Sequence, residues 1–313
     1  LFSRWQALTD LALPNLMQAA RDAREGREIT CDPALIAALL EAAADDTLEP
    51  AFRAQALALP SESDIARELG GNNDPDAIHT GRQGIITLIA KAGAKAFEAL
   101  FSGMRIEGPF TPDAASAGKR ALRNSALAYL TCVDGTPTRA AEAFAAADNM
   151  TDMMQALTVL AHRFPDQAET QAALAAFLKR FEENPLVLDK WFSIQATIPG
   201  HAALNRVKAL LEDPHYVATN PNRVRSLVGS FAFANPTGFN RPDGDGYRFL
   251  ADQILAIDPR NPQLAARILT SMRSWRSLES VRADQARAVL ADIQRKTKLS
   301  TDVRDIVERM LTG

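Results

Sequence analysis

The sequence predicts an all-α protein in which antiparallel helices stack one after another into a superhelix. Alanine and leucine dominate the composition, while the alternating Val, Ile and Tyr patterns of β-strands are almost absent. Prolines recur at short intervals, and each interval carries one apolar stripe with helical spacing. No strict repeat length emerges, which favours an irregular repeat of the HEAT or ARM type over a consensus repeat.

The first half of the chain is predicted to form helices separated by glycine and proline breaks. The first apolar stripe runs from Leu8 to Leu16, and a second helix begins at Asp32-Pro33. Glycines and asparagines at 70–75 form the first strong break, and one long helix is expected from about Asp76 to Phe101. Further helices are expected at 121–133, at 138–147 and after a start at Asn149 or Thr151.

Asparagine–proline and aspartate–proline steps divide the second half. Asparagine and aspartate are good N-caps, and proline suits the first helical position because its missing N–H would have no partner there. The steps lie at 184–185, 213–214, 220–221, 235–236, 258–259 and 261–262, and the last helices are predicted at 278–297 and 302–311. Such short elements disfavour a compact bundle with long crossovers. No linker is evident, so residues 1–313 are predicted to form one domain.

The segment 220–231 begins with the N-cap Asn220 and the first-turn Pro221. Its core face is predicted to comprise Val224, Leu227, Val228 and Phe231, which recur at i, i+3, i+4 and i+7. At ~100° per residue, Arg223 and Arg225 fall on opposite flanks of that face. Only one of these two arginines can therefore point into any given cavity.

The turn at 243–246, Asp-Gly-Asp-Gly, invites comparison with a calcium-binding loop. An EF-hand needs an oxygen ligand at position 5 and glycine at position 6, whereas this chain has Tyr247 and Arg248 there. The turn is therefore predicted to be an Asx-type connection that leads into a helix near Tyr247.

Composition and charge exclude several classes of protein. The net charge of -3 argues against nucleic-acid binding, which usually needs a basic surface. No apolar run approaches the ~20 residues of a membrane helix, so no membrane partner is expected. Cys31 and Cys132 are interpreted as free thiols in a reducing compartment, the cytoplasm, in preference to a single bridge. The start at Leu1, without Met or a capping signal, suggests a piece of a longer protein.

The spacing of the histidines does not match the zinc centre of an HExxH peptidase, and a site assembled from scattered histidines is the less favoured alternative. A zinc peptidase needs two histidines one helical turn apart with a glutamate between them. The four histidines are His79, His162, His201 and His215, and no two are spaced in this way. No cofactor or metal is therefore expected in this chain.

Other polar residues are interpreted as ordinary surface. Lys119, Arg120 and Arg123 are predicted to form a solvated helix face. Around the expected core aromatics at 191–192, Asp189 and Lys190 are predicted to turn outward.

Several longer motifs carry a resemblance to a known family. They are the NPNRVRSL run at 220–227 followed by the turn at 243–250, the VLDKWF segment at 187–192, RNPQLAAR at 260–267, KRALRNSAL at 119–127 and ALPS at 58–61. In this order they resemble the C-terminal region of bacterial aminopeptidase N, a family of zinc metallopeptidases. The family's HExxH and Gly-x-Met-Glu-Asn motifs are absent from these residues.

The resemblance implies a C-terminal helical domain that caps a catalytic domain, encloses its active-site chamber and controls peptide access. Its partners would be the catalytic domain of the same polypeptide, which holds the zinc, and short peptides. The parent would remove N-terminal amino acids, whereas this chain alone would be inactive. Arg225 and Arg267, with Gln263 on the same helix face as Arg267, would line the substrate channel, although composition alone favours solvated arginines. The alternative is a stand-alone HEAT-like scaffold for protein interaction.

Overall fold

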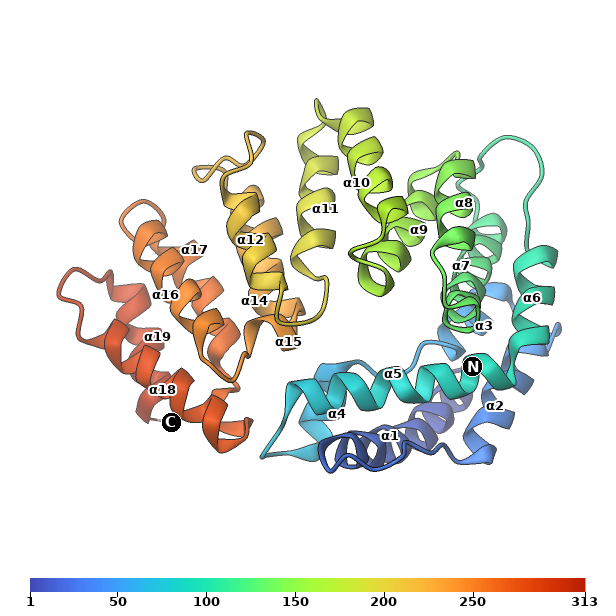
Figure 1. The fold of residues 1–313 in the computed structure, drawn as a ribbon, viewed down its shortest axis with the longest axis horizontal. Helices are drawn as coiled ribbons and strands as arrows, with labels where there is room; N and C mark the ends of the chain where they lie inside the picture. Colours follow the sequence, from blue (N-terminus) through green and yellow to red (C-terminus); the bar gives the residue numbers. More distant parts are fainter. Residues whose placement is uncertain (313) are drawn as a thin grey trace. The chain divides into compact units, whose positions relative to one another are not determined.

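The computed structural model describes residues 1–312 and shows an all-α fold (Figure 1). Within this range no strand forms, and the β-type pairing is an isolated parallel bridge between Asn73 and Leu278. The all-α prediction is confirmed. In chain order the α-helices are α1 (Phe2–Arg24), α2 (Pro33–Ala44), α3 (Pro50–Ala56), α4 (Glu62–Leu69), α5 (Pro75–Ala92), α6 (Ala94–Gly103), α7 (Ala114–Asp134), α8 (Thr138–Ala146), α9 (Met150–Arg163), α10 (Ala168–Phe181), α11 (Pro185–Ala196), α12 (Ala203–Leu211), α13 (Pro221–Val224), α14 (Ser230–Ala234), α15 (Pro236–Phe239), α16 (Asp245–Ile257), α17 (Pro262–Leu269), α18 (Ser280–Gln294) and α19 (Thr301–Thr312). A π-helical turn, η1 (Arg225–Gly229), and two 3-10 turns, η2 (Thr270–Met272) and η3 (Trp275–Ser277), complete the elements.

The chain forms two compact units. The first comprises Leu1–Glu68 and Ala77–Ala175, and the second comprises Leu69–Asp76 and the chain from Ala176 onward. In the first unit α7 is the central helix and packs against α3, α6, α8 and α9. Its Tyr129 stacks on Phe97 of α6 with ring centroids 4.5 Å apart. In the second unit α17 and α18 each pack against both α16 and α19, and η1 packs against α11 and α17.

The four asparagine–proline steps open helices, as the sequence predicts, whereas the aspartate–proline steps at 213–214 and 258–259 lie in turns and open none. The Asn184 side chain accepts hydrogen bonds from the backbone N–H groups of Leu186 and Val187 at the start of α11. The caps of α2, α13, α15 and α17 work in the same way, with proline in the first turn each time. Between the two candidate starts of α9, the structure selects Asn149, whose side chain caps Asp152.

One predicted helix is broken in two. The long helix expected from Asp76 to Phe101 ends at Ala92, and α6 begins at Ala94. Gly93 lies between them with φ -95° and ψ 7°, outside the helical region. A Cβ at this position would lie 2.4 Å from the Leu40 side chain and 2.6 Å from the Phe97 side chain. The packing of α2 and α6 at this point therefore requires glycine, and apolar spacing alone did not reveal the break.

Arginines hold the C-terminal ends of neighbouring helices. Buried Arg53 donates from Nε and Nη2 to the Ala43 carbonyl in the last turn of α2, at 2.8 and 2.6 Å. Arg123 donates to the Phe101 carbonyl near the end of α6 at 3.2 Å, and Arg276 donates to the Met310 carbonyl of α19 at 2.7 Å. Such last-turn carbonyls lack a hydrogen-bond donor within their own helix and carry partial negative charge. A guanidinium supplies both the donor and a compensating positive charge.

Candidate functional site

The segment that carries Arg225 is a helix interrupted by a π-helical turn. The Ser230 N–H donates to the Arg225 carbonyl five residues earlier, which defines η1 between α13 and α14. The predicted core face is confirmed, since Val224, Leu227, Val228 and Phe231 are all buried. The apolar spacing gave no sign of the extra residue in this turn.

Arg223 and Arg225 point in different directions, as their spacing predicts. Arg223 is buried and donates from Nε to Asp189 at 2.8 Å and from Nη1 to the His215 carbonyl at 2.7 Å. Its guanidinium also lies over the Phe192 ring. The expectation that Asp189 turns outward is therefore wrong, because that carboxylate neutralises a buried arginine. Arg225 is exposed, and among residues 1–312 its guanidinium donates to the Asn222 side chain alone, at 2.9 Å.

Arg267 and Gln263 are both exposed on α17, where the four-residue spacing places them on one face. Asn261 caps this helix, and Leu264 and Ile268 bury its opposite face. The Arg267 guanidinium makes no hydrogen bond or ion pair with residues 1–312. Because α17 packs against η1, the structure places the three predicted channel residues on two adjacent elements. In the described chain, no carboxylate pairs with the guanidinium group of Arg225 or of Arg267.

The histidines make separate pairs with carboxylates. His79 Nδ1 lies 2.7 Å from Glu62, His201 Nε2 lies 3.0 Å from Asp76, and His215 Nδ1 lies 2.9 Å from Asp213. Across the part of the chain that the structure describes, no three His, Cys, Asp or Glu side chains are grouped to hold a metal ion. The residues present therefore do not fit a zinc centre.

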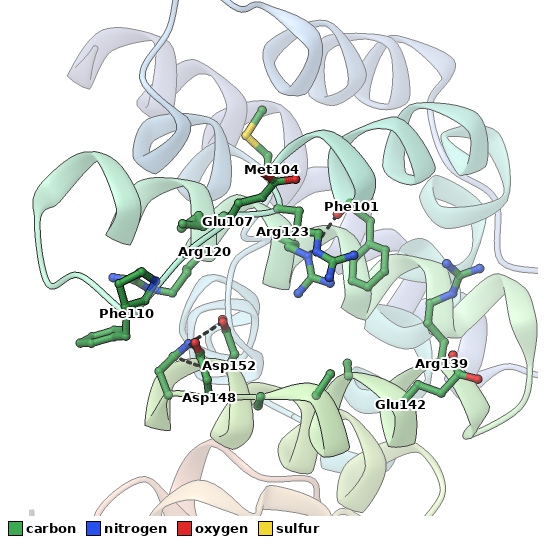
Figure 2. A pocket seen from close by; sticks show the side chains of 18 of the residues that line it. Phe101, Met104, Glu107, Phe110, Arg120, Arg123, Arg139, Glu142, Asp148 and Asp152 are labelled. Atoms are coloured by element: carbon green, nitrogen blue, oxygen red, sulfur yellow. Dashed lines mark hydrogen bonds between the residues drawn. The ribbon is translucent and has the colours of Figure 1, made fainter.

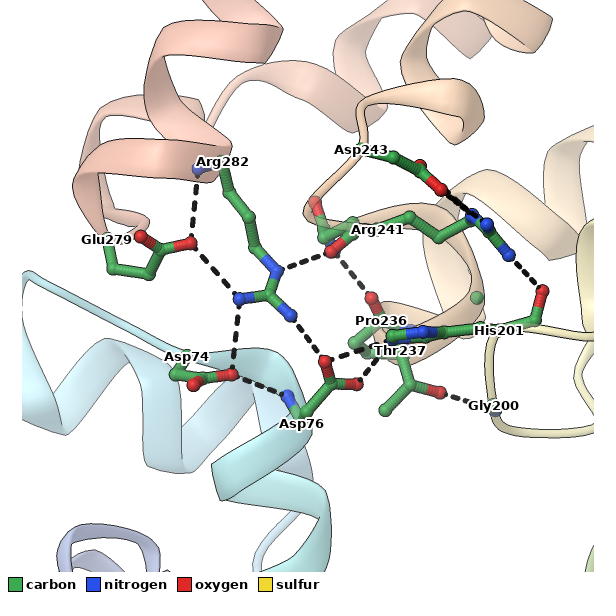
Figure 3. Close-up of polar contacts among 12 residues, drawn as sticks. Asp74, Asp76, Gly200, His201, Pro236, Thr237, Arg241, Asp243, Glu279 and Arg282 are labelled. Atoms are coloured by element: carbon green, nitrogen blue, oxygen red, sulfur yellow. Dashed lines mark hydrogen bonds and ion pairs between the residues drawn. The ribbon is translucent and has the colours of Figure 1, made fainter. Parts of the chain in front are cut away.

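A buried ionic cluster in the second unit joins residues far apart in sequence (Figure 3). Arg282 is 5% exposed and forms ion pairs with Asp74, Asp76 and Glu279. His201 also pairs with Asp76. The cluster attaches the segment Leu69–Asp76 to α18. No local motif signals the cluster, because its members are separated by up to 206 residues.

The turn at 243–246 lies near this cluster. Hydrogen bonds from Arg241 lower the pKa of Asp243 to about 2. The Asp243 side chain accepts a hydrogen bond from the Asp245 N–H, which confirms the predicted Asx-type turn.

The first unit contains a cavity of about 1110 Å³ lined by the end of α6, the loop after it, α7 and the α8–α9 junction (Figure 2). Arg120 and Arg123 of α7 line it, although the sequence suggested a solvated basic face. That interpretation is wrong for these two residues: Arg120 is 6% exposed and Arg123 is half-buried, and only Lys119 is exposed. Burial lowers the pKa of the Arg123 guanidinium, and the charge of Asp152 partly opposes this effect.

Comparison with known families gives the wider context of these sites. A sequence model of the family described as "Domain of unknown function (DUF3458_C) ARM repeats" matches residues 1–312. The chain belongs to the DUF3458_C family. This membership confirms the expected ARM-type repeat. In the described part of this DUF3458_C chain, no helix has the length and apolarity needed to cross a membrane.

Relatives of this DUF3458_C chain are aminopeptidases. Aminopeptidase N of Caulobacter vibrioides is 39% identical to it over 99% of the chain and 36% of the relative. For aminopeptidase N of Escherichia coli the identity is 30%, over 99% of the chain and 35% of the relative. The crystal structure of Legionella pneumophila aminopeptidase A in complex with aspartic acid matches at 28% identity with a TM-score of 0.86, over 98% of the chain and 36% of that protein. The DUF3458_C chain thus corresponds to the C-terminal domain of aminopeptidase N and spans little more than a third of these relatives.

Proposed function

We propose that this domain caps the catalytic domain of a zinc aminopeptidase N, encloses the active-site chamber and controls which peptides enter it. The observation that carries the proposal is the match of 99% of the chain to aminopeptidase N proteins. In such an enzyme, a zinc ion in the catalytic domain would activate the water that cleaves the N-terminal residue from a peptide. This domain would supply shape and charge, and its closure would exclude bulk water and folded proteins.

Within this proposal, Arg225, Arg267 and Gln263 line the substrate channel. Arg225 and Arg267 are exposed on adjacent packed elements, and no carboxylate of residues 1–312 neutralises either side chain. Guanidinium groups bind carboxylates through two parallel hydrogen bonds, so a peptide's C-terminal carboxylate is the ligand that suits them. Gln263 shares the face of Arg267 and offers an amide for the peptide backbone.

Replacing Arg225 or Arg267 by alanine in the full-length enzyme is expected to raise KM for tripeptides more than for uncharged aminoacyl anilides. The difference should be about 1 to 3 kcal/mol for each lost charged hydrogen bond. Steady-state kinetics with both substrates gives the comparison. Arg309→Ala is a matched control, because Arg309 is an exposed arginine of α19 that pairs with Asp305. Equal effects on both substrates, or an effect no larger than that of the control, would contradict the channel assignment.

The chain itself is expected to bind no stoichiometric zinc and to hydrolyse no aminoacyl anilide. The physical reason is the missing ligand set, since no three His, Cys, Asp or Glu side chains of the described residues are grouped to hold a metal ion. Metal analysis after dialysis and an anilide assay with and without a chelator test this expectation. One tightly held zinc per chain with chelator-sensitive hydrolysis would refute it.

A further inference from the structure

Two arginines in the first-unit cavity have most of their hydrogen-bonding capacity unused. Arg120 is 6% exposed, yet within residues 1–312 its side chain makes one hydrogen bond, from Nη2 to the Thr111 carbonyl at 2.9 Å. In the same range the Arg123 side chain donates from Nε alone, to the Phe101 carbonyl. Neither forms an ion pair with residues 1–312, although buried charges are normally paired. Each guanidinium instead lies against an aromatic ring, Phe110 for Arg120 and Phe101 for Arg123, at 4.7 and 4.2 Å.

The missing ion pairs do not result from a shortage of carboxylates around the cavity. Arg139 lines the same cavity and is fully paired, with Asp134 at 2.6 Å and Glu98 at 3.0 Å. Arg120 and Arg123 lie three residues apart on α7, and both line the cavity. A carboxylate bound in the cavity would neutralise these charges and accept hydrogen bonds from their remaining N–H groups.

Carboxylates form the other wall of the cavity. Figure 2 shows Asp148 and Asp152 across the open space from the two arginines. Both belong to the α8–α9 junction, where they accept hydrogen bonds from neutral amides: the Asn149 side chain bonds to both, and the Asn124 side chain bonds to Asp152. No cation of residues 1–312 forms an ion pair with either carboxylate. Within the described chain, the cavity therefore has two arginines without ion pairs on one side and two aspartates without ion pairs on the other.

We propose that this cavity is a binding site for a small zwitterion with a free carboxylate and a free ammonium group, the chemistry of a short peptide or a free amino acid. Arg120 and Arg123 bind the carboxylate, and Asp148 and Asp152 bind the ammonium group. The volume of about 1110 Å³ is sufficient for a peptide of a few residues. The site lies in the first unit and is built from none of the residues assigned to the substrate channel, so it stands independently of the proposed function.

The test is calorimetric titration of the 313-residue chain with four ligands: trialanine, N-acetyl-trialanine, trialanine amide and alanine. Trialanine is expected to bind, whereas acetylation and amidation each weaken binding roughly tenfold or more, because each removes one charge-assisted contact. Alanine distinguishes the two sources: equal affinity for alanine assigns the site to free amino acids, and weaker affinity assigns it to peptides. No binding of trialanine or alanine at millimolar concentration, or equal binding of the blocked peptides, would overturn the proposal.

Matched variants locate the binding. Arg123→Gln and Asp148→Asn keep the size of each side chain and remove one charge from each wall, and both should weaken zwitterion binding by roughly tenfold. Arg309→Gln, at an exposed arginine of α19 that pairs with Asp305 and has no part in either site, should leave this binding unchanged. The unfolding midpoint of each variant shows whether the fold is retained, and Asp148 is exposed, so its variant is not expected to disturb packing. Unweakened binding in the two cavity variants, or a loss in Arg309→Gln as large as theirs, would place the ligand elsewhere and refute the site.

Discussion

Replacing Arg282 by methionine is expected to lower the free energy of unfolding by about 3 to 5 kcal/mol, the usual cost of removing one partner from a buried ionic cluster. Arg282 is 5% exposed, and Glu279 lies 3.1 Å and Asp74 3.4 Å from its Nη1. Without the guanidinium, three carboxylates would face one another. Glu279, whose side chain is 11% exposed, would have the least access to water. The loss should therefore far exceed that of a surface ion pair.

Urea unfolding followed by circular dichroism measures this effect, and two further variants sharpen it. Arg295→Met removes an arginine of similar size just after α18 whose side chain is 75% exposed, so its stability should hardly change. Arg282→Lys keeps the charge but lacks the planar fork that reaches several carboxylates, so an intermediate loss is expected. If Arg282→Met destabilises the protein no more than Arg295→Met does, the cluster does not hold Leu69–Asp76 in place.

Gly246→Ala is expected to destabilise the second unit by about 3 kcal/mol, at the upper end of the usual cost of overpacking. Gly246 lies in the first turn of α16, where a Cβ would be 2.0 Å from the Phe239 carbonyl oxygen. That neighbour is backbone, so it cannot move aside by changing a rotamer. The whole α15–α16 connection would have to shift, together with the edge-to-face contact between Phe239 and Tyr247.

Gly103→Ala serves as the control for this prediction. Gly103 ends α6, and a Cβ there would meet no atom within 4 Å. Alanine should be neutral or slightly stabilising at this position, because it favours a helix over glycine by up to about 1 kcal/mol. Thermal unfolding gives the melting temperatures of both variants for comparison with that of the unsubstituted protein. A similar melting temperature for Gly246→Ala and the unsubstituted protein would show that α16 can move away from Phe239 at little cost.

The features that could be predicted from the sequence are those that depend on residues a few positions apart. Asn220 and Asn261 were identified as caps because an Asn-Pro step satisfies the first turn of a helix locally. The core face around Leu227 followed from its helical period. The different directions of Arg223 and Arg225 followed from the same period, but nothing local showed that Asp189 would neutralise Arg223.

Features that depend on tertiary packing were missed. The break at Gly93 arises from the side chains of Leu40 and Phe97, which no periodicity around Gly93 encodes. Arg120 was predicted to be solvated because it forms a basic cluster with Lys119 and Arg123, yet it is buried and contacts Phe110 and Thr111 of the loop after α6. The Arg282 cluster joins residues 74–76 to residues 279–282, and His201 adds a third segment through Asp76. In each case the environment of the residue is set by parts of the chain remote in sequence.

Some helix ends are held in place by an arginine of a neighbouring helix. The position of such an end therefore does not depend on the length of the loop that follows it. Arg53 holds the end of α2 and Arg123 holds the end of α6, in each case from a different helix. Insertions or deletions in the next loop should then leave the helix where it is, because longer loops cost little entropy. The loop between α6 and α7 forms one side of the zwitterion cavity. Its length can therefore change during evolution, and with it the size of the ligand, while the charged walls on α7 and at the α8–α9 junction stay fixed.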